Sequence, residues 1–215
     1  MFRLIDMDTW PRRPYFEHYT RDVPCTYSIC RDLDITNLRQ RRVRLYPTML
    51  FLLTEQVNRY PEFRMALDAS GHLGVYDMMH PSYTVFHRET ETFSNLWTLF
   101  DPHYLTFCRN YDEDQRLYGA LEGFSPKPDM PENTFPVSMI PWTDFTGFHL
   151  HLDHGSGYLL PIFTMGKFSE AGGRWRMPIA MQVHHGVCDG FHAARFLESL
   201  QERMNTFAPE KEMSI

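Results

Sequence analysis

The sequence predicts one α+β domain spanning residues 1–215, a two-layer sandwich with helices on one face of a largely antiparallel, mixed β-sheet. Three observations support this prediction. Segments with helical and with strand periodicity occur in mixed order along the chain. No repeat, low-complexity segment or long linker divides it. Hydrophobic residues make up 43% and aromatic residues 15% of the chain, enough for a large core and a further apolar surface.

Two helices are expected in the first third of the chain. Residues 34–36 provide an N-cap, and Leu38 begins the apolar face of the first helix. The second helix begins near Tyr46-Pro47, because proline is tolerated in a first helical turn. Its end is marked by Pro61. Apolar residues between these points recur at helical spacing, at Met49, Leu50, Leu53 and Val57.

Strands and one further helix follow. Short alternating segments predict the first strands, over 64–67, 72–76 and 83–88. A helix is expected over 102–118, and the proline-rich stretch 126–131 predicts a loop, because proline cannot donate to a β-ladder. Later strands are expected over 135–140, 145–150, 160–168 and 175–183. The apolar face of the closing helix is expected at Phe191, Ala194, Leu197, Leu200 and Met204.

Charge and composition exclude several classes of protein. The net charge is −6 and no basic patch is concentrated enough for nucleic-acid binding. The longest apolar stretch, 49–53, is too short to span a membrane, and the N-terminal residues show no leader peptide. The four cysteines form no C-x-x-C pair and are interpreted as reduced thiols. We therefore expect a soluble, cytoplasmic protein.

The run 184–190 lies between a predicted strand and the closing helix, and its residues are His-His-Gly-Val-Cys-Asp-Gly. Histidine is the usual base for a hydroxyl proton near neutral pH. A position beside a glycine turn lets the backbone fix the ring and leaves one nitrogen free. An arbitrary His-His pair is more often structural, whereas Asp189-Gly190 and the helix that follows favour catalysis here.

This run resembles the His-His-x-x-x-Asp-Gly signature of type A chloramphenicol acetyltransferases. A similar signature occurs in the acyltransferase domains of 2-oxoacid dehydrogenase complexes, which share only the short motif. The longer run 182–192 is similar to the chloramphenicol family almost letter for letter. Further similar segments are spread over most of the chain, at 15–17, 25–27, 34–36, 63–66, 84–87, 89–94, 141–142 and 163–167.

The resemblance implies transfer of an acetyl group from acetyl-CoA, a co-substrate, to a hydroxyl of chloramphenicol or a similar small hydroxylated substrate. No permanently bound cofactor is implied. The second histidine, His185, corresponds to the family's general base, and Ser138, before Pro141-Trp142, to its oxyanion-stabilising serine. Thr164 corresponds to a threonine that holds a water at the same intermediate. Without the resemblance, Ser138 would be interpreted as a strand serine bonded to backbone.

Asp189 lies close to His185 in sequence, which suggests a catalytic triad like that of serine hydrolases. We reject that interpretation, because a carboxylate at a helix start is favoured as a cap. In the family the corresponding aspartate pairs with an N-terminal arginine, which is Arg12 in this chain. The resemblance thus implies a supporting role for Arg12 and Asp189, with His185 oriented by backbone contacts.

The binding residues are also implied by the resemblance; from the sequence alone most would be assigned to the core. The acceptor positions are Tyr19, Tyr27, Thr84, Phe93, Phe148, Leu150 and Ile162. The acetyl-CoA positions are Tyr46, Trp142, Lys167 and Phe168. The family forms trimers with each active site between two subunits, which implies a homotrimer here.

Alternatives remain open. In the first alternative, the enzyme acetylates a different alcohol. In the second, the chain is a trimeric, non-catalytic binder of hydrophobic ligands. The presence of both His185 and Ser138 argues against a binder. A metal site is a minor alternative at His149, His151 and Asp153, where a strand would align the side chains on one face. No neighbouring groups that would orient the ligands accompany it, so we predict no metal.

Overall fold

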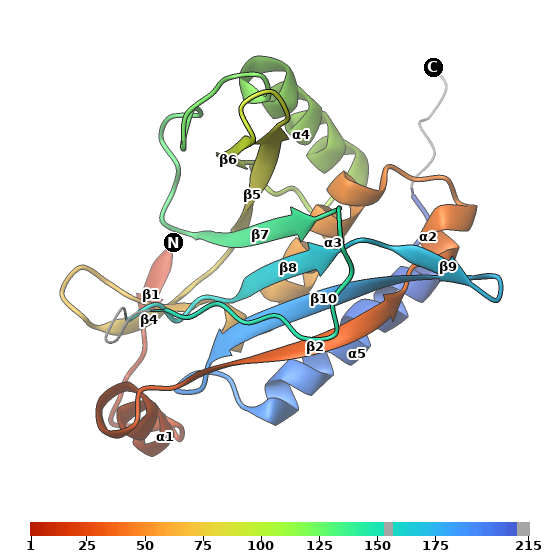
Figure 1. The fold of residues 1–215 in the computed structure, drawn as a ribbon. Helices are drawn as coiled ribbons and strands as arrows, with labels where there is room; N and C mark the ends of the chain where they lie inside the picture. Colours follow the sequence, from red (N-terminus) through yellow and green to blue (C-terminus); the bar gives the residue numbers. More distant parts are fainter. Residues whose placement is uncertain (153–156, 210–215) are drawn as a thin grey trace.

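A mixed sheet of seven strands forms the centre of the computed structural model, which describes residues 1–152 and 157–209 (Figure 1). The strand order is β2-β10-β8-β7-β5-β6, and β9 pairs with the beginning of β10. The strands are β2 (Thr26–Asp34), β5 (His80–His87), β6 (Thr92–Trp97), β7 (Thr134–Ile140), β8 (Ile162–Gly166), β9 (Ser169–Ala171) and β10 (Arg174–His184). Strand β10 is antiparallel to both β2 and β8, whereas β7 is parallel to β8 and β5.

A second, three-stranded antiparallel sheet has the order β1-β4-β3. Its strands are β1 (Phe2–Leu4), β3 (Met65–Leu67) and β4 (Leu73–Tyr76). The Phe2 ring lies 4.7 Å from the Tyr76 ring and passes so close over Gly74 that a Cβ atom there would clash with it. This contact fixes the N-terminal strand to the rest of the molecule.

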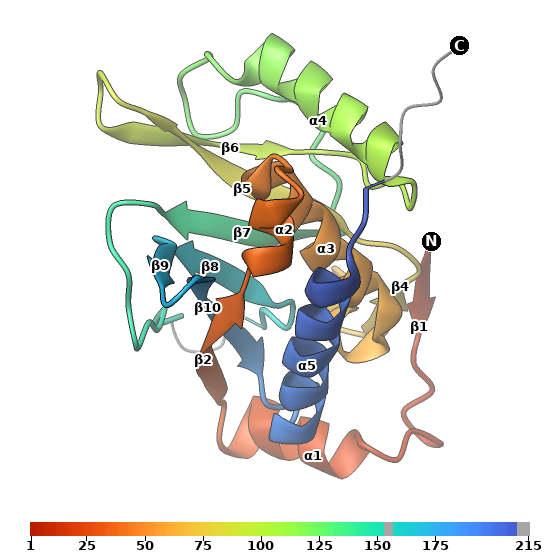
Figure 2. The same cartoon turned by 90° about the vertical axis from the view of Figure 1, so that its right-hand side faces the viewer.

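Some of the helices cover one face of the main sheet, as predicted, and the others lie beside it. The helices are α1 (Arg13–Glu17), α2 (Thr36–Gln40), α3 (Leu45–Arg59), α4 (Tyr104–Tyr118) and α5 (Gly190–Thr206), with a π-helical turn η1 (His18–Asp22) and a 3-10 turn η2 (Pro61–Phe63). Figure 2 shows α2, α3 and α5 together on one side of the sheet, with the chain after β7 on the other. In the described residues, no helix has the length and apolar character required to cross a membrane. The predicted α+β sandwich is confirmed.

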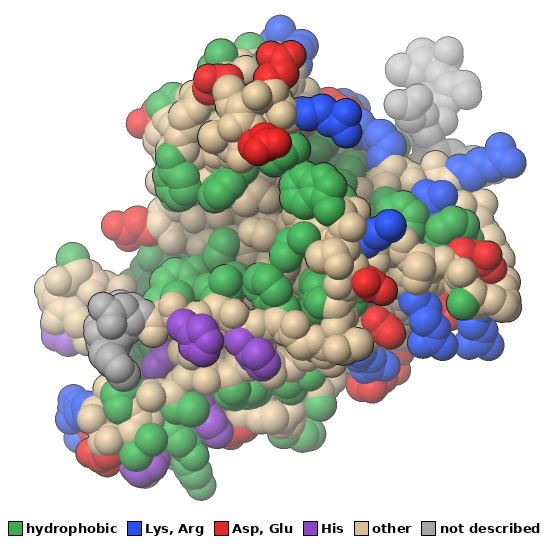
Figure 3. All heavy atoms as spheres, in the orientation of Figure 1, with side chains coloured by type: hydrophobic (Ala, Val, Ile, Leu, Met, Phe, Trp, Pro, Cys, Tyr) green, Lys and Arg blue, Asp and Glu red, His purple; other side chains and the backbone are tan. Residues whose placement is uncertain are grey.

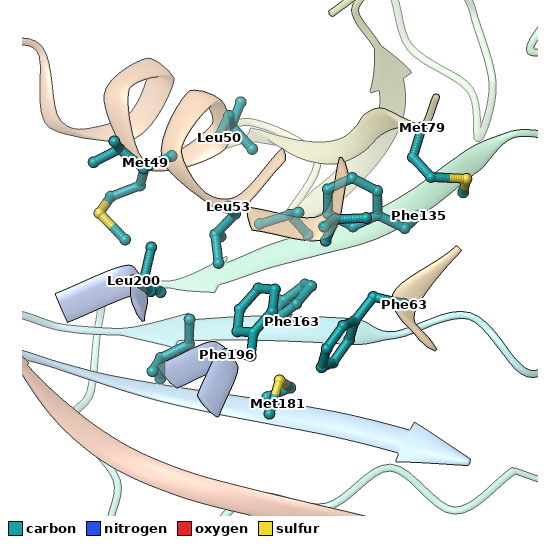
Figure 4. Close-up of a cluster of buried hydrophobic side chains, with 14 of the residues drawn as sticks. Met49, Leu50, Leu53, Phe63, Met79, Phe135, Phe163, Met181, Phe196 and Leu200 are labelled. Atoms are coloured by element: carbon teal, nitrogen blue, oxygen red, sulfur yellow. The ribbon is translucent and has the colours of Figure 1, made fainter. Parts of the chain in front are cut away.

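The core lies between this helical layer and the sheet (Figure 4). Side chains of a strand leave alternate faces, so Met181 of β10 and Phe163 of β8 point toward the helices. The Phe163 ring stacks on Phe196 of α5 with centroids 5.3 Å apart. Phe196 also lies 4.5 Å from Phe63 of η2. These aromatic contacts join the helical layer to the central strands.

Several elements differ from the sequence prediction. Strand β2 was missed, although its alternating Tyr27, Ile29 and Leu33 carry a strand signal; Arg31 interrupts the alternation. Strand β6 and helix α1 were missed as well. The strand predicted over 145–150 is wrong: the N–H groups of Phe148 and Leu150 donate to side chains, Sγ of Cys30 and Oε1 of Gln182, instead of to a neighbouring strand.

The buried face of α5 also differs in part. Leu197, Leu200 and Met204 are buried as predicted. Phe191 is 71% exposed and Ala194 is exposed, so these two assignments are wrong. Ala193 and Phe196 take their places, because the helix starts at Gly190 and its first turn presents a different set of residues to the core.

We predict that Phe196→Ala lowers the free energy of unfolding by about 3–5 kcal/mol, because a fully buried ring is removed from an aromatic cluster. The matched control is Phe191→Ala in the same helix, where the loss should stay below about 1 kcal/mol. Urea unfolding followed by circular dichroism measures both. Equal losses in the two variants would contradict the assigned core face.

Candidate active site

A cavity of about 490 Å³ opens on the face of the sheet away from the helices. Figure 3 shows hydrophobic side chains gathered in the hollow between the β5–β6 hairpin and the strands below it. Eight of the predicted site residues line the cavity: Tyr46, Thr84, Phe93, Ser138, Trp142, Phe148, Leu150 and Thr164. Six lining residues were not predicted: Phe86, Glu91, Thr92, Met139, Ile140 and Pro141.

The floor of the cavity carries two hydroxyl side chains from adjacent strands. Ser138 of β7 is the register partner of Thr164 of β8, and Thr164 is the partner of Ala180 of β10. Residues directly opposite in a sheet project from the same face, so both hydroxyls face the cavity. Thr164 is only 3% exposed, whereas Ser138 is half-buried.

Aromatic residues form the outer wall. The Phe86 ring meets the Trp142 ring edge to face at 4.6 Å, and both are largely exposed in the single chain. Phe86 was not predicted as a site residue, although it lies two residues after Thr84 and therefore on the same face of β5. The Tyr46 hydroxyl donates to the carbonyl oxygen of Thr84 at 3.3 Å, and burial raises the pKa of Tyr46, so it stays protonated.

The segment 141–150 closes the cavity and is held down on the sheet at separate points. The Lys167 N–H donates to the carbonyl oxygen of Thr143 at 2.8 Å. Phe145 lies over Gly166, where any Cβ atom would come within 2.9 Å of its ring. The Leu150 N–H donates to Gln182 at 2.9 Å. Predicted residue Ile162 lines a small crevice behind this segment.

A second group of predicted residues surrounds His185, directly after β10. Its backbone N–H donates to the carbonyl oxygen of Cys25 at 2.9 Å. The imidazole stacks on Tyr19 of η1, with centroids 3.9 Å apart and planes 11° apart, and meets Tyr27 edge-on at 5.4 Å. Atom Nδ1 is buried without a hydrogen-bond partner, 3.4 Å from Oδ1 of Asp189. The ring is thus oriented by stacking and by its backbone.

Asp189 is held by an arginine instead of by the histidine. Arg12 donates from Nη1 to Oδ2 at 2.5 Å and from Nη2 to Oδ1 at 2.9 Å, so the expected Arg12–Asp189 pair is present. This bidentate contact lowers the pKa of Asp189 and raises that of Arg12. Asp189 is also the N-cap residue of α5. The Asp189 carboxylate both binds Arg12 and caps α5. It therefore connects the N-terminal segment to the turn that carries His185.

The neighbours of His185 in the motif are structural. Nδ1 of His184 accepts from the Gly186 N–H at 3.1 Å, and burial lowers the pKa of His184. Cys188 is 1% exposed, and burial raises the pKa of its thiol to about 12. A buried, protonated thiol is a poor nucleophile, so Cys188 fits no covalent step.

The alternative metal site finds no support in the described residues, where no group of three His, Cys, Asp or Glu side chains is placed to hold an ion. His149 and His151 lie outside any strand, so the expected alignment on one face is wrong. Asp153 lies outside the described residues.

Sequence comparisons decide the family. A family model described as chloramphenicol acetyltransferase matches residues 1–201. A chloramphenicol acetyltransferase of Campylobacter coli is 53% identical over 204 residues, covering 95% of this chain and 99% of the relative. One from Vibrio anguillarum is 50% identical over 201 residues, covering 94% and 93%. The chain belongs to the chloramphenicol acetyltransferase family. The sequence resemblance is thereby confirmed, and the protein is an acyltransferase.

Solved structures agree with the family assignment. A chloramphenicol acetyltransferase structure superposes with a TM-score of 0.80 at 25% identity, over 95% of this chain and 100% of the other. A dihydrolipoamide acetyltransferase of Azotobacter vinelandii superposes with a TM-score of 0.61 at 16% identity, over 85% and 82%. The second likeness concerns the fold alone.

Within one chain of this acetyltransferase, the predicted site residues fall into two separate groups. Strands β7 and β8 end at one side of the sheet and β10 ends at the other, beside α1 (Figure 1). His185 lies on the order of 15 Å along β10 from Ala180, the residue in register with Thr164. His185 is absent from the residues that line the cavity. Phe168 packs on Trp175 at 5.8 Å and Lys167 is exposed, also outside the cavity.

We predict that the Arg12–Asp189 pair stabilises the acetyltransferase in a pH-dependent way. The pKa of Asp189 is lowered in the folded state, so the pair contributes fully above the unfolded pKa of about 3.9 and is lost as pH falls through the folded pKa. Asp189→Asn should therefore lower the free energy of unfolding at pH 7, and the difference from the unmodified chain should shrink below pH 4.

Urea unfolding at pH 7 and pH 3 measures this difference. Asp8→Asn is the matched control, because Asp8 also pairs with an arginine but its side chain is 90% exposed. A difference for Asp189→Asn that stays constant between the two pH values would contradict the ionic role of the pair.

Proposed function

We propose that the chain transfers the acetyl group of acetyl-CoA to a hydroxyl of chloramphenicol. The observation that carries this proposal is the cavity with Ser138 and Thr164 on its floor, in a chain of the chloramphenicol acetyltransferase family. An apolar cavity of about 490 Å³ suits a small aromatic alcohol, and its few polar groups suit one reacting carbonyl.

In the proposed reaction, His185 is the general base. Its Nδ1 atom is buried, so Nε2 is the nitrogen that meets the substrate hydroxyl. As the hydroxyl oxygen attacks the thioester carbonyl, Nε2 takes the hydroxyl proton, and the same proton goes to the CoA sulfur when the C–S bond breaks. The Ser138 hydroxyl donates to the oxyanion, a contribution of about 3 kcal/mol. Thr164, beside it, holds a water at the same intermediate.

The active site is proposed to form between two subunits of a homotrimer. His185 lies too far from Ser138 in one chain for both to touch the same reacting carbon. In the trimer, the base comes from a neighbouring chain. Its His185, which is surrounded by Tyr19 and Tyr27, faces the cavity of the first chain. The acceptor then lies between those tyrosines and the cavity residues Thr84, Phe93, Phe148 and Leu150, with Ile162 behind them.

Acetyl-CoA is proposed to enter along the aromatic wall. Tyr46 and Trp142 line the cavity mouth, and Lys167 and Phe168 follow directly after β8. Arg39 lies over the Phe168 ring at 5.2 Å, so two cationic side chains border this path. Such charges suit the phosphates of the co-substrate.

The proposed function predicts that CoA thiol is released from acetyl-CoA only when chloramphenicol is present. Loss of the base in His185→Ala should lower kcat by about three orders of magnitude, with binding of both substrates retained. Thiol titration with a chromogenic disulfide, and equilibrium binding, measure these quantities. His72→Ala is the control, since His72 is an exposed histidine that pairs with Asp68, and its kcat should be unchanged.

Two outcomes would contradict the proposal. Thiol release with another alcohol but not with chloramphenicol would assign a different acceptor. Activity that survives His185→Ala would remove the proposed base.

The shared site predicts complementation between two inactive variants. His185→Ala and Ser138→Ala chains, refolded together in equal amounts, should regain about a quarter of the unmodified activity, because each mixed trimer restores one of its three sites. Mixing without unfolding is the control and should restore nothing while the trimers stay intact. No recovery after joint refolding would place the whole site within one chain.

A further inference from the structure

A cluster of charged side chains lies behind the turn that carries His185. The backbone N–H of Asp189 donates to Nδ1 of His192 at 3.0 Å. Nε2 of the same ring lies 3.5 Å from Oε1 of Glu62, which belongs to η2. Arg195 donates to this glutamate oxygen at 3.1 Å. The side chains of Glu62 and His192 are each only 14% exposed, so the cluster is nearly enclosed.

The bond from Asp189 determines the state of the His192 ring. Because Nδ1 accepts a hydrogen bond from a backbone N–H, the ring proton is on Nε2 and the imidazole is neutral. Burial lowers the pKa of His192 and favours the same neutral form. The Nε2–H group then lies 3.5 Å from Oε1 of Glu62, and a carboxylate oxygen can accept from it.

This arrangement connects Glu62 to the base through the helix start. His192 closes a capping box on Asp189, the N-cap residue of α5. The Asp189 carboxylate is fixed by Arg12 and lies 3.4 Å from Nδ1 of His185. A His192 ring that turned away would release the Asp189 backbone, and the turn between β10 and α5 would lose one of its supports.

We propose that Glu62 is a positioning residue for the His185 turn and that it acts through His192. By facing Nε2–H, Glu62 holds the ring with Nδ1 toward the Asp189 N–H, and so fixes the backbone on which Asp189 and His185 are carried. The catalytic part of this proposal rests on His185 as the base. The signature run 184–190 gives no indication of this role, because Glu62 follows α3 and is distant from that run in sequence.

The test compares Glu62→Leu, His192→Leu and the double variant. Glu62→Leu should lower kcat by about tenfold and leave KM for chloramphenicol and for acetyl-CoA within about twofold, because a displaced base affects the transition state more than binding. If Glu62 acts through His192, the double variant is no slower than His192→Leu. Losses that multiply in the double variant would overturn the proposal.

Two further variants separate positioning from stability. Glu62→Gln keeps a carbonyl oxygen that faces Nε2–H, and should restore most of kcat. Glu55→Leu is the matched control, because Glu55 of α3 forms a similar contact with α5, accepting from Nε of Arg203 at 2.8 Å, and this contact involves no histidine. Glu55→Leu should lower the free energy of unfolding and leave kcat unchanged. Equal kcat losses in Glu55→Leu and Glu62→Leu would overturn the positioning role.

Measurements without substrate test the contact itself. Nitrogen NMR of the unmodified protein should find Nδ1 of His192 unprotonated; a proton on Nδ1 would overturn the proposal even if Glu62→Leu did not fold. Amide hydrogen exchange at Asp189 should become about tenfold faster in Glu62→Leu and His192→Leu but not in Glu55→Leu. Unchanged exchange in Glu62→Leu refutes the positioning role, whereas absent thiol release in the unmodified protein refutes the proposed function.

Discussion

The pleat of β10 is the constraint on which the rest of the structure depends. Its odd-numbered residues, such as Met181, pack on the helices, and its even-numbered residues, such as Ala180 and Gln182, support the cavity side. The same strand ends at His184, directly before His185. A shift of one residue in its pairing would exchange core and cavity residues, so burial of one face fixes the geometry of the other.

Charge around the His185 turn serves orientation as well as stability. Partly buried ion pairs offset much of their attraction by the cost of removing both groups from water. Arg12 and Asp189 nevertheless meet in a bidentate geometry, which constrains the direction of the carboxylate as well as its distance. Stacking of Tyr19 on His185 adds a second restraint from the same N-terminal segment. Arg12 and Tyr19 therefore restrain the position of a group that lies more than 160 residues later in the chain.

Local features of the fold and site were predictable from the sequence, and features that depend on distant contacts were not. Helix α3 was predicted because its apolar residues repeat at regular spacing, and the run 184–190 was recognised because its residues are contiguous. The segment 145–150 has the composition of a strand, but its backbone bonds to side chains, which no periodicity reveals. The role of Glu62 and the distance between His185 and Ser138 depend on tertiary contacts alone.

The irregular segment 141–150 has a consequence for the evolution of substrate range. It forms a cavity wall, yet it attaches to the sheet through a few contacts and contributes no strand to the core. Exposed connections of this kind accept substitutions with little effect on the packed layers beneath them. Substitutions confined to this segment can therefore change which acceptor is bound while the sheet and helices still fold. Natural or laboratory selection can act on the segment in this way.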